Sequence, residues 1–218
     1  MNMDKRPDVI LFDWDNTLID SWAIIHEVMN VTLETFGHAP WSLPETRNRV
    51  ARSMRDSFPD LFGDDWEKAG EVFYSHFETI HLEKLAPLPG AEDMLSGLFD
   101  AGLPMGVVSN KRGDILRRES THLGWDRFFG QVIGAGDAAH DKPSADPIYL
   151  ALGQNEVPAG AEVWYVGDGL IDMKTAAAAG CVGVLLRPDP PEVGEFRGSP
   201  PVRHAPDCKA LFNIVQNL

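Results

Sequence analysis

The sequence is poor in cysteine and has no long apolar runs. Cys181 and Cys208 are its only cysteines, too few for a disulfide framework or a four-cysteine zinc site. No stretch approaches the roughly 18 apolar residues that a membrane-spanning helix needs. The first residues also lack an apolar segment long enough for a signal peptide. These absences predict a reduced, cytoplasmic protein with no membrane partner.

Basic residues are also scarce relative to acidic ones. The chain of 218 residues has 19 Lys and Arg against 33 Asp and Glu, which gives a formal net charge of −14. Nucleic-acid binding depends on neutralising phosphates, so a chain this acidic is a poor general partner for nucleic acid. Its length predicts one domain, or one domain with a smaller insertion. We expect a monomer or a homodimer, between which the sequence does not choose.

Short apolar runs alternate with helical patterns along most of the chain. Each run is typical of a strand buried on both faces, and the alternation predicts an α/β fold with a doubly wound, Rossmann-like parallel sheet. The runs cover residues 9–12, 105–109, 131–134, 162–166 and 182–186. Helical patterns cover residues 91–99, 114–123, 144–152, 171–179 and 207–217. The proline-rich segment 188–206 predicts a surface loop.

Residues 20–86 break this alternation, because they contain helical patterns and no convincing strand. Apolar residues at helical spacing predict helices near residues 25–36 and 66–80, and we expect a third over residues 45–58. The sequence therefore predicts a small all-helical domain at residues 20–86. It would be inserted after the first strand of a core made of residues 1–19 and 87–218.

Polar residues follow several of the predicted strands. Open α/β sheets bind ligands at the carboxyl ends of their strands, so we expect these residues to gather at one edge. They are Asp13-Trp14-Asp15-Asn16-Thr17-Leu18, Ser109-Asn110, Lys142 and Gly167-Asp168-Gly169-Leu170-Ile171-Asp172. Taken alone, the first segment could be a solvated turn, since Asp, Asn and Thr are turn formers. Its agreement with the other strand ends favours a functional site.

The carboxylates among these residues predict a magnesium site. Asp13, Asp15, Asp168 and Asp172 cannot crowd together in ionised form without a cation, and oxygen ligands with room for water and phosphate suit Mg²⁺. Lys142 would offset further charge. Asp13 would then act as a nucleophile that forms an aspartyl-phosphate, while Asp15 would protonate the leaving oxygen and later activate water.

Substrate binding is assigned to a second group of residues. Ser109 and nearby backbone N–H groups would hold phosphoryl oxygens, and we place Thr17 and Asn110 with them. Arg52 and Arg55 are three residues apart and would share a helix face, from which one could reach a second anionic group of the substrate. The alternative is a solvated charged face, because four aspartates lie close in sequence: Asp56, Asp60, Asp64 and Asp65.

The order of these motifs resembles a known family. Asp-x-Asp-x-Thr, Ser-Asn, Lys-Pro and Gly-Asp-x-x-x-Asp, in this order, look like the haloacid-dehalogenase-like hydrolase superfamily. The helical insertion at residues 20–86 resembles the cap domain of its phosphoglycolate-phosphatase-like branch, and Pro87-Leu88-Pro89-Gly90-Ala91 also resembles that branch. The likeness extends to about residue 187. It implies a Mg²⁺-dependent phosphatase acting on a small phosphorylated metabolite, and a phosphoglycolate-like substrate is a natural candidate.

The resemblance also implies individual roles. Mg²⁺ would be bound by Asp13, the backbone carbonyl of Asp15, and Asp168, with Asp172 supporting the site through water or hydrogen bonds. Lys142 would orient the nucleophile, and Ser109 would contact phosphate.

Two positions depart from the family pattern. Asn16 stands where the branch usually has Gly, but Asn tolerates unusual backbone angles better than most residues. Gly169 stands where Ser or Thr is common, which removes a hydroxyl but no charge. Trp14 occupies the unspecified middle position, where we expect packing rather than contact with substrate.

Other functions remain open at this level. A phosphosugar mutase would return the phosphoryl group to the substrate, and a non-catalytic phosphate-ligand binder would keep the fold without turnover. A dehalogenase is disfavoured because it needs no acid at Asp15. Decay to a binder is disfavoured because all four motifs keep their charged residues.

Overall fold

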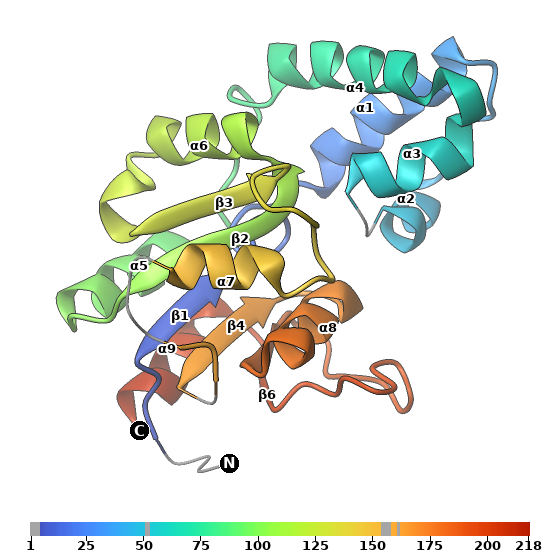
Figure 1. Ribbon diagram of the computed structural model, residues 1–218. Coiled ribbons are helices and arrows are strands. Elements are labelled where there is room, and N and C mark those ends of the chain that lie inside the picture. The colour runs from blue at the N-terminus through green and yellow to red at the C-terminus, as the bar shows by residue number, and fades with distance from the viewer. Residues whose placement is uncertain (1–4, 51–52, 154–157, 161) are drawn as a thin grey trace. The chain divides into compact units, whose positions relative to one another are not determined.

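The computed structural model describes residues 5–50, 53–153, 158–160 and 162–218. The chain divides into two compact units: Met1–Ile19 with Pro87–Leu218, and Asp20–Ala86. The larger unit contains a β-sheet with helices, and the smaller one is helical (Figure 1). Among the helices of the described residues, none is both long and apolar enough to cross a membrane.

The larger unit is built on a six-stranded sheet in which every neighbouring pair is parallel. The spatial order is β3-β2-β1-β4-β5-β6. This arrangement confirms the predicted doubly wound α/β fold, and it places the carboxyl ends of β1, β2 and β4 side by side. The strands are β1 (Val9–Phe12), β2 (Met105–Arg112), β3 (Gln131–Ala135), β4 (Val163–Gly167), β5 (Val182–Leu186) and β6 (Arg203–Ala205).

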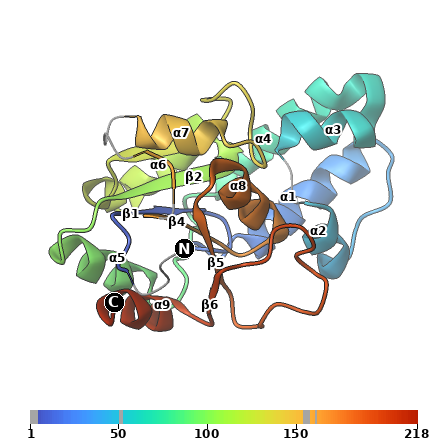
Figure 2. The ribbon, with the colours of Figure 1, turned by 60° about the horizontal axis from the view of Figure 1, so that its bottom comes forward.

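Helices cover both faces of this sheet. Figure 2 shows α7 and α8 on one face and α5 and α9 on the other. On the first face, Leu11 of β1 and Tyr165 of β4 belong to one buried cluster with Ile148 of α7 and Ala176 of α8. The helices are α5 (Ala91–Asp100), α6 (Gly113–His122), α7 (Asp146–Leu152), α8 (Leu170–Ala179) and α9 (Cys208–Gln216), with a 3-10 turn η2 (Trp125–Phe128). Burial on both faces explains why the strands read as continuous apolar runs.

The smaller unit has a core of its own. Met29 and Leu33 of its first helix pack with Phe58, Phe62 and Ala69, and the Phe58 and Phe62 rings lie 5.0 Å apart. Its elements are α1 (Trp22–Thr35), α2 (Leu43–Arg49), α3 (Met54–Phe62), the 3-10 turn η1 (Gly63–Asp65) and α4 (Trp66–Ile80). The apolar periodicity that predicted the first and last helices is the pattern that fills this core.

The prediction of a single helix over residues 45–58 is wrong, because α2 and α3 are separate helices. Val50 ends α2 with a ψ of 87°, and Ser53 precedes α3 with a ψ of 158°. Neither value is helical. The start of α2 is fixed by Ser42 and Glu45, whose side chains bond to each other's backbone N–H in a capping box.

Two strand boundaries also differ from the prediction. Residues 203–205 were expected in a surface loop, yet they form β6, which pairs with β5. This short strand has no apolar run to signal it, and only its pairing defines it. β2 continues past Ser109 to Arg112, beyond a register shift between Val108 and Arg112. The extension carries Lys111 on a strand rather than in a loop.

Candidate active site

The first motif turns sharply where β1 ends. The Asp13 N–H donates to Val166 O of β4 at 2.8 Å, which continues the sheet pairing by one residue. Asn16 then adopts a positive φ of 62°, a conformation that Asn tolerates, and Leu18 N donates back to Trp14 O at 2.9 Å. The chain therefore curls at the sheet edge, which brings both aspartates of the motif to one end of the sheet.

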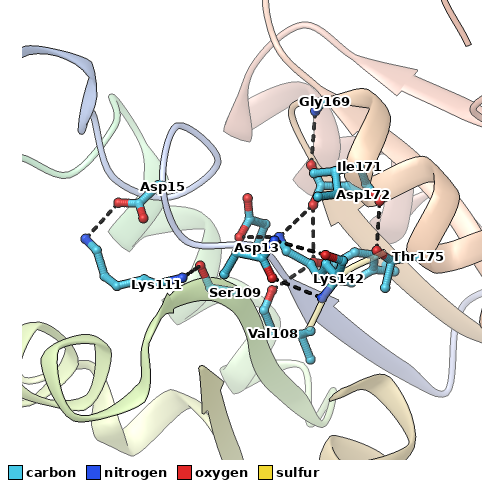
Figure 3. Close-up of polar contacts among 12 residues, drawn as sticks. Asp13, Asp15, Val108, Ser109, Lys111, Lys142, Gly169, Ile171, Asp172 and Thr175 are labelled. Atoms are coloured by element: carbon cyan, nitrogen blue, oxygen red, sulfur yellow. Dashed lines mark hydrogen bonds and ion pairs between the residues drawn. The ribbon is translucent and has the colours of Figure 1, made fainter. Parts of the chain in front are cut away.

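Lys142 lies at the centre of the site and joins two motifs. Its Nζ is 2.8 Å from Asp13 Oδ1 and 2.8 Å from Asp172 Oδ1 (Figure 3). All three side chains are buried. Burial alone would lower the pKa of Lys142, but the two carboxylates outweigh it and hold that pKa well above its usual value. The lysine is therefore a fixed positive charge between the first and last motifs.

Asp172 is held by groups from two elements. The Gly169 N–H donates to Asp172 Oδ2 at 3.0 Å, and the Tyr165 hydroxyl lies 3.3 Å from Asp172 Oδ1. The same hydroxyl donates to Val108 O at 2.8 Å. A side chain at Gly167 would clash with the Asp172 carboxyl, so glycine is required there. With the Lys142 ion pair, these contacts use most of the hydrogen-bonding capacity of the Asp172 carboxylate.

Three carboxylates form a group suited to a cation. Ligand atoms of Asp13, Asp168 and Asp172 lie within 4.8 Å of one another. Burial, assisted by the charge of Asp172, raises the pKa of Asp13 to about 6 against the opposing effect of Lys142. Burial and the neighbouring carboxylates also raise the pKa of Asp168 well above its usual range. One ammonium thus leaves negative charge uncompensated, and the oxygen donors fit a hard divalent cation.

Asp15 faces a different partner. Its Oδ1 is 2.7 Å from Lys111 Nζ, which is also 2.7 Å from Glu119 Oε2 (Figure 3 shows the first pair). The Asp15 carboxylate is not among the three whose ligand atoms lie within 4.8 Å of one another, so its side chain does not join the group of four carboxylates expected from the sequence. This separation is compatible with the two roles expected of Asp15, a metal contact through its backbone carbonyl and proton exchange through its side chain.

Trp14 packs inside the larger unit, as we expected. It is fully buried, and its ring lies edge-on to Trp125 with centroids 5.7 Å apart. The indole Nε1 donates to Glu119 Oε2 at 2.7 Å.

The residues expected to bind substrate have unequal surroundings. Ser109 is buried at the site edge of β2, and its Oγ accepts from Lys111 N at 3.2 Å. Thr17 is fully buried, and its hydroxyl has no hydrogen-bond partner among the described residues. The side chain of Asn110 bonds to the backbone of Lys142. Arg55 is exposed on α3 in the smaller unit, and Arg52 lies outside the described residues.

Three residues beside the site, Tyr165, Lys111 and Glu119, were not predicted from the sequence. Tyr165 lies within an apolar run, and a hydroxyl group in a strand buried on both faces needs a hydrogen-bond partner. That requirement was the available signal for Tyr165. Glu119 follows Leu116 by three positions and Ile115 by four, so it shares their buried helix face. A carboxylate on a buried face requires a partner, and that need was the available signal. Lys111 directly follows Ser109-Asn110 in the sequence, and this position beside a predicted site motif was the available signal.

Fold and site together define an α/β protein with an acidic, lysine-bridged candidate active site at the carboxyl edge of a parallel sheet. Comparison with known families gives the more specific assignment. The family model of haloacid dehalogenase-like hydrolases matches residues 10–185. The chain belongs to this family, which confirms the resemblance seen in its motifs.

Individual relatives agree with this assignment. Phosphoglycolate phosphatase of Rhodobacter capsulatus is 32% identical over 186 residues, which cover 81% of this chain and 82% of the relative. Phosphoglycolate phosphatase of Xylella fastidiosa is 31% identical over 178 residues, covering 80% and 77%. The crystal structure of a predicted phosphatase from Clostridium acetobutylicum has a TM-score of 0.85 at 19% identity, covering 98% and 100% of the two chains, and shows the same fold.

Proposed function

We propose that this protein hydrolyses a small phosphomonoester through an aspartyl-phosphate on Asp13, with Mg²⁺ as cofactor. The observation that carries the proposal is the Lys142 ammonium, which bridges Asp13 and Asp172 at 2.8 Å each. The family and the phosphatase names of the relatives agree with the predicted class, a phosphoric monoester hydrolase.

The first half of the reaction moves the phosphoryl group to Asp13. A carboxylate oxygen of Asp13 attacks phosphorus, and the bond between phosphorus and the ester oxygen breaks with its electron pair going to that oxygen. Asp15 gives the leaving oxygen a proton, so the alcohol departs neutral. Lys142 holds Asp13 in place, which keeps the attacking oxygen oriented.

The second half returns the enzyme to its starting state. Asp15, now ionised, takes a proton from water while the water oxygen attacks phosphorus. The bond between phosphorus and Asp13 breaks, and inorganic phosphate leaves. Ser109, Thr17 and backbone N–H groups at the strand ends are the donors available for the phosphoryl oxygens.

Mg²⁺, held by Asp13, Asp168 and the Asp15 carbonyl with Asp172 in support, would neutralise charge on the phosphoryl group and on the carboxylates. The uncompensated charge of the acidic group is the structural support for this assignment. A bound Mg²⁺ would explain why three carboxylates are tolerated around one ammonium.

Substrate choice is assigned to the smaller unit, which we propose acts as a cap. Phosphoglycolate is the first substrate to test, because the relatives named above carry that activity in their names. Arg55 is the described cap residue that we assign to a second anionic group of the substrate.

The test is phosphate release from a panel of esters. The purified protein with Mg²⁺ is assayed on phosphoglycolate, several sugar monophosphates and an aryl phosphate, with Asp13→Asn as the inactive control. We expect inorganic phosphate from at least one alkyl ester and from the aryl ester. Conversion of a sugar monophosphate to an isomer without phosphate release would establish a mutase instead. No turnover of any ester would contradict the proposal.

A further inference from the structure

A second buried charge network lies beside the proposed catalytic group. The Lys111 ammonium sits between two carboxylates, 2.7 Å from Asp15 Oδ1 and 2.7 Å from Glu119 Oε2. The side chains are 1% exposed at Glu119, 7% at Lys111 and 19% at Asp15. The network therefore connects the enclosed carboxylate of Glu119 to the more exposed carboxylate of Asp15, which would exchange protons with the leaving group and with water.

Glu119 also contacts the first motif through the side chain of Trp14. It lies on α6, and the same Oε2 accepts from Trp14 Nε1 at 2.7 Å. Trp14 stands between Asp13 and Asp15 in the chain and is fully buried. One carboxylate thus fixes the indole between the two aspartates and also the ammonium that contacts Asp15.

Stability alone does not account for this arrangement. Burying a carboxylate and an ammonium carries a desolvation cost of several kcal/mol per ion, and well-packed apolar residues often stabilise a protein as well or better. Neither Lys111 nor Glu119 is assigned to the phosphorus chemistry. What the network supplies is a fixed direction for the Asp15 side chain, since a charged hydrogen bond constrains geometry strongly.

We propose that Lys111 and Glu119 are positioning residues for Asp15. Glu119 fixes the Lys111 ammonium, and Lys111 fixes the carboxyl group that exchanges a proton with the leaving oxygen and with water. The inference rests on the proposed phosphatase function. Misplacing a catalytic group by about 1 Å can cost on the order of 10²-fold in rate, so proton transfer should be sensitive to both residues.

The test uses leaving groups of different quality. An aryl phosphate departs without protonation, whereas an alkyl phosphate needs the proton from Asp15. In Lys111→Met and Glu119→Gln we expect kcat/KM for the alkyl ester to fall by about 10- to 100-fold, with a much smaller fall for the aryl ester. Lys111→Arg should recover part of the alkyl activity, because it restores a cation between the carboxylates.

A second readout does not depend on steady-state rates. Asp15 must also activate water, so the aspartyl-phosphate should accumulate in both variants. Mass spectrometry of rapidly quenched protein should then find more phosphate on the Asp13 peptide than in the unmutated protein. The matched controls are Lys209→Met on α9 and Asp114→Asn on α6, which should change neither readout. Both residues are exposed.

The outcomes separate the two proposals. An unmutated protein without phosphatase activity would overturn the proposed function. An active protein whose variants lose aryl and alkyl kcat/KM equally, or only gain a higher KM, would show that Lys111 binds substrate and overturn the positioning inference. Glu119→Gln keeps a hydrogen-bond acceptor for Trp14, so we expect it to fold more readily than Lys111→Met. If circular dichroism shows both variants unfolded, the network serves stability and the inference is wrong.

Discussion

The side chain of Asn110 forms two reciprocal hydrogen bonds with the backbone of Lys142. Asn110 Nδ2 donates to Lys142 O at 3.2 Å, and Lys142 N donates to Asn110 Oδ1 at 3.0 Å. The two residues are 32 positions apart in sequence. The end of β2 therefore fixes the lysine backbone independently of the ion pairs that its side chain forms with Asp13 and Asp172.

Removing the lysine should nearly abolish turnover. Lys142→Met leaves Asp13 and Asp172 buried without their shared cation, and loss of one such electrostatic group costs on the order of 10²–10³-fold in kcat. Phosphate release at saturating ester and Mg²⁺ measures the effect. Asn110→Ala should show a smaller loss, since the ammonium remains. If Lys111→Met abolishes aryl phosphate turnover while Lys142→Met does not, the assignment of the central cation is wrong.

Metal removal should stop the reaction reversibly. The carboxylates around Lys142 carry excess negative charge, so we expect a chelator to eliminate turnover and Mg²⁺ to restore it. Mg²⁺ should also raise Tm, because a ligand that binds only the folded state stabilises it. The Asp168→Asn variant should lose most of this Tm rise, whereas the exposed Asp100→Asn control should keep it. Undiminished turnover after thorough metal removal contradicts the proposal.

Substitution of the two aspartates of the first motif should impair different steps of the reaction. Asp13→Asn should eliminate the phosphoenzyme, because an amide oxygen is a poor nucleophile. Asp15→Asn keeps the nucleophile but lacks the general acid and base, worth about 10²–10⁴-fold. An alkyl ester should therefore suffer more than an aryl ester, and phosphate should persist on the Asp13 peptide.

Quenched-flow mass spectrometry distinguishes these cases. Phosphate found on Asp15 in the unmutated protein would reverse the two roles. Equal losses for aryl and alkyl esters in Asp15→Asn would remove the case for a general acid.

The buried Asp13 should make the metal-free protein less stable as pH rises. Its pKa is raised from 3.8 to about 6 by burial, so between these values the folded state binds more protons than the unfolded state. Stability from this group is complete below about pH 4 and is lost as pH rises through about 6. Asp13→Asn should therefore be more stable than the unmutated protein at pH 7, by on the order of 3 kcal/mol, and similar at pH 4.

Urea unfolding in the presence of a chelator, at pH 4 and pH 7, measures this difference. Mg²⁺ should shrink it, because the cation replaces the missing positive charge. Asp100→Asn serves as the exposed control. A variant that is less stable than the unmutated protein at pH 7 without metal would show that Asp13 is not strained by its burial.

Local sequence patterns determined the larger features of this protein. Continuous apolar runs predicted the parallel sheet, because a strand buried on both faces has apolar residues at successive positions. Apolar residues at 3.6-residue spacing predicted the helices between the strands. Polar residues directly after those runs predicted which side chains gather at the sheet edge. The interruption at residues 20–86 matches the bounds of the smaller unit, since a segment without strands cannot join the sheet.

Tertiary structure alone decided which polar groups pair. Asn110 bonds to the backbone of a residue 32 positions away, Tyr165 reaches Val108 across the sheet, and Glu119 on α6 reaches Trp14 behind the first motif. No short-range pattern encodes these partners, because each contact depends on the order of strands in the sheet and on the helix that covers them. The strand β6 and the break between α2 and α3 belong here too. Strand β6 is defined only by its pairing with β5. The break between α2 and α3 results from the non-helical backbone conformations of Val50 and Ser53.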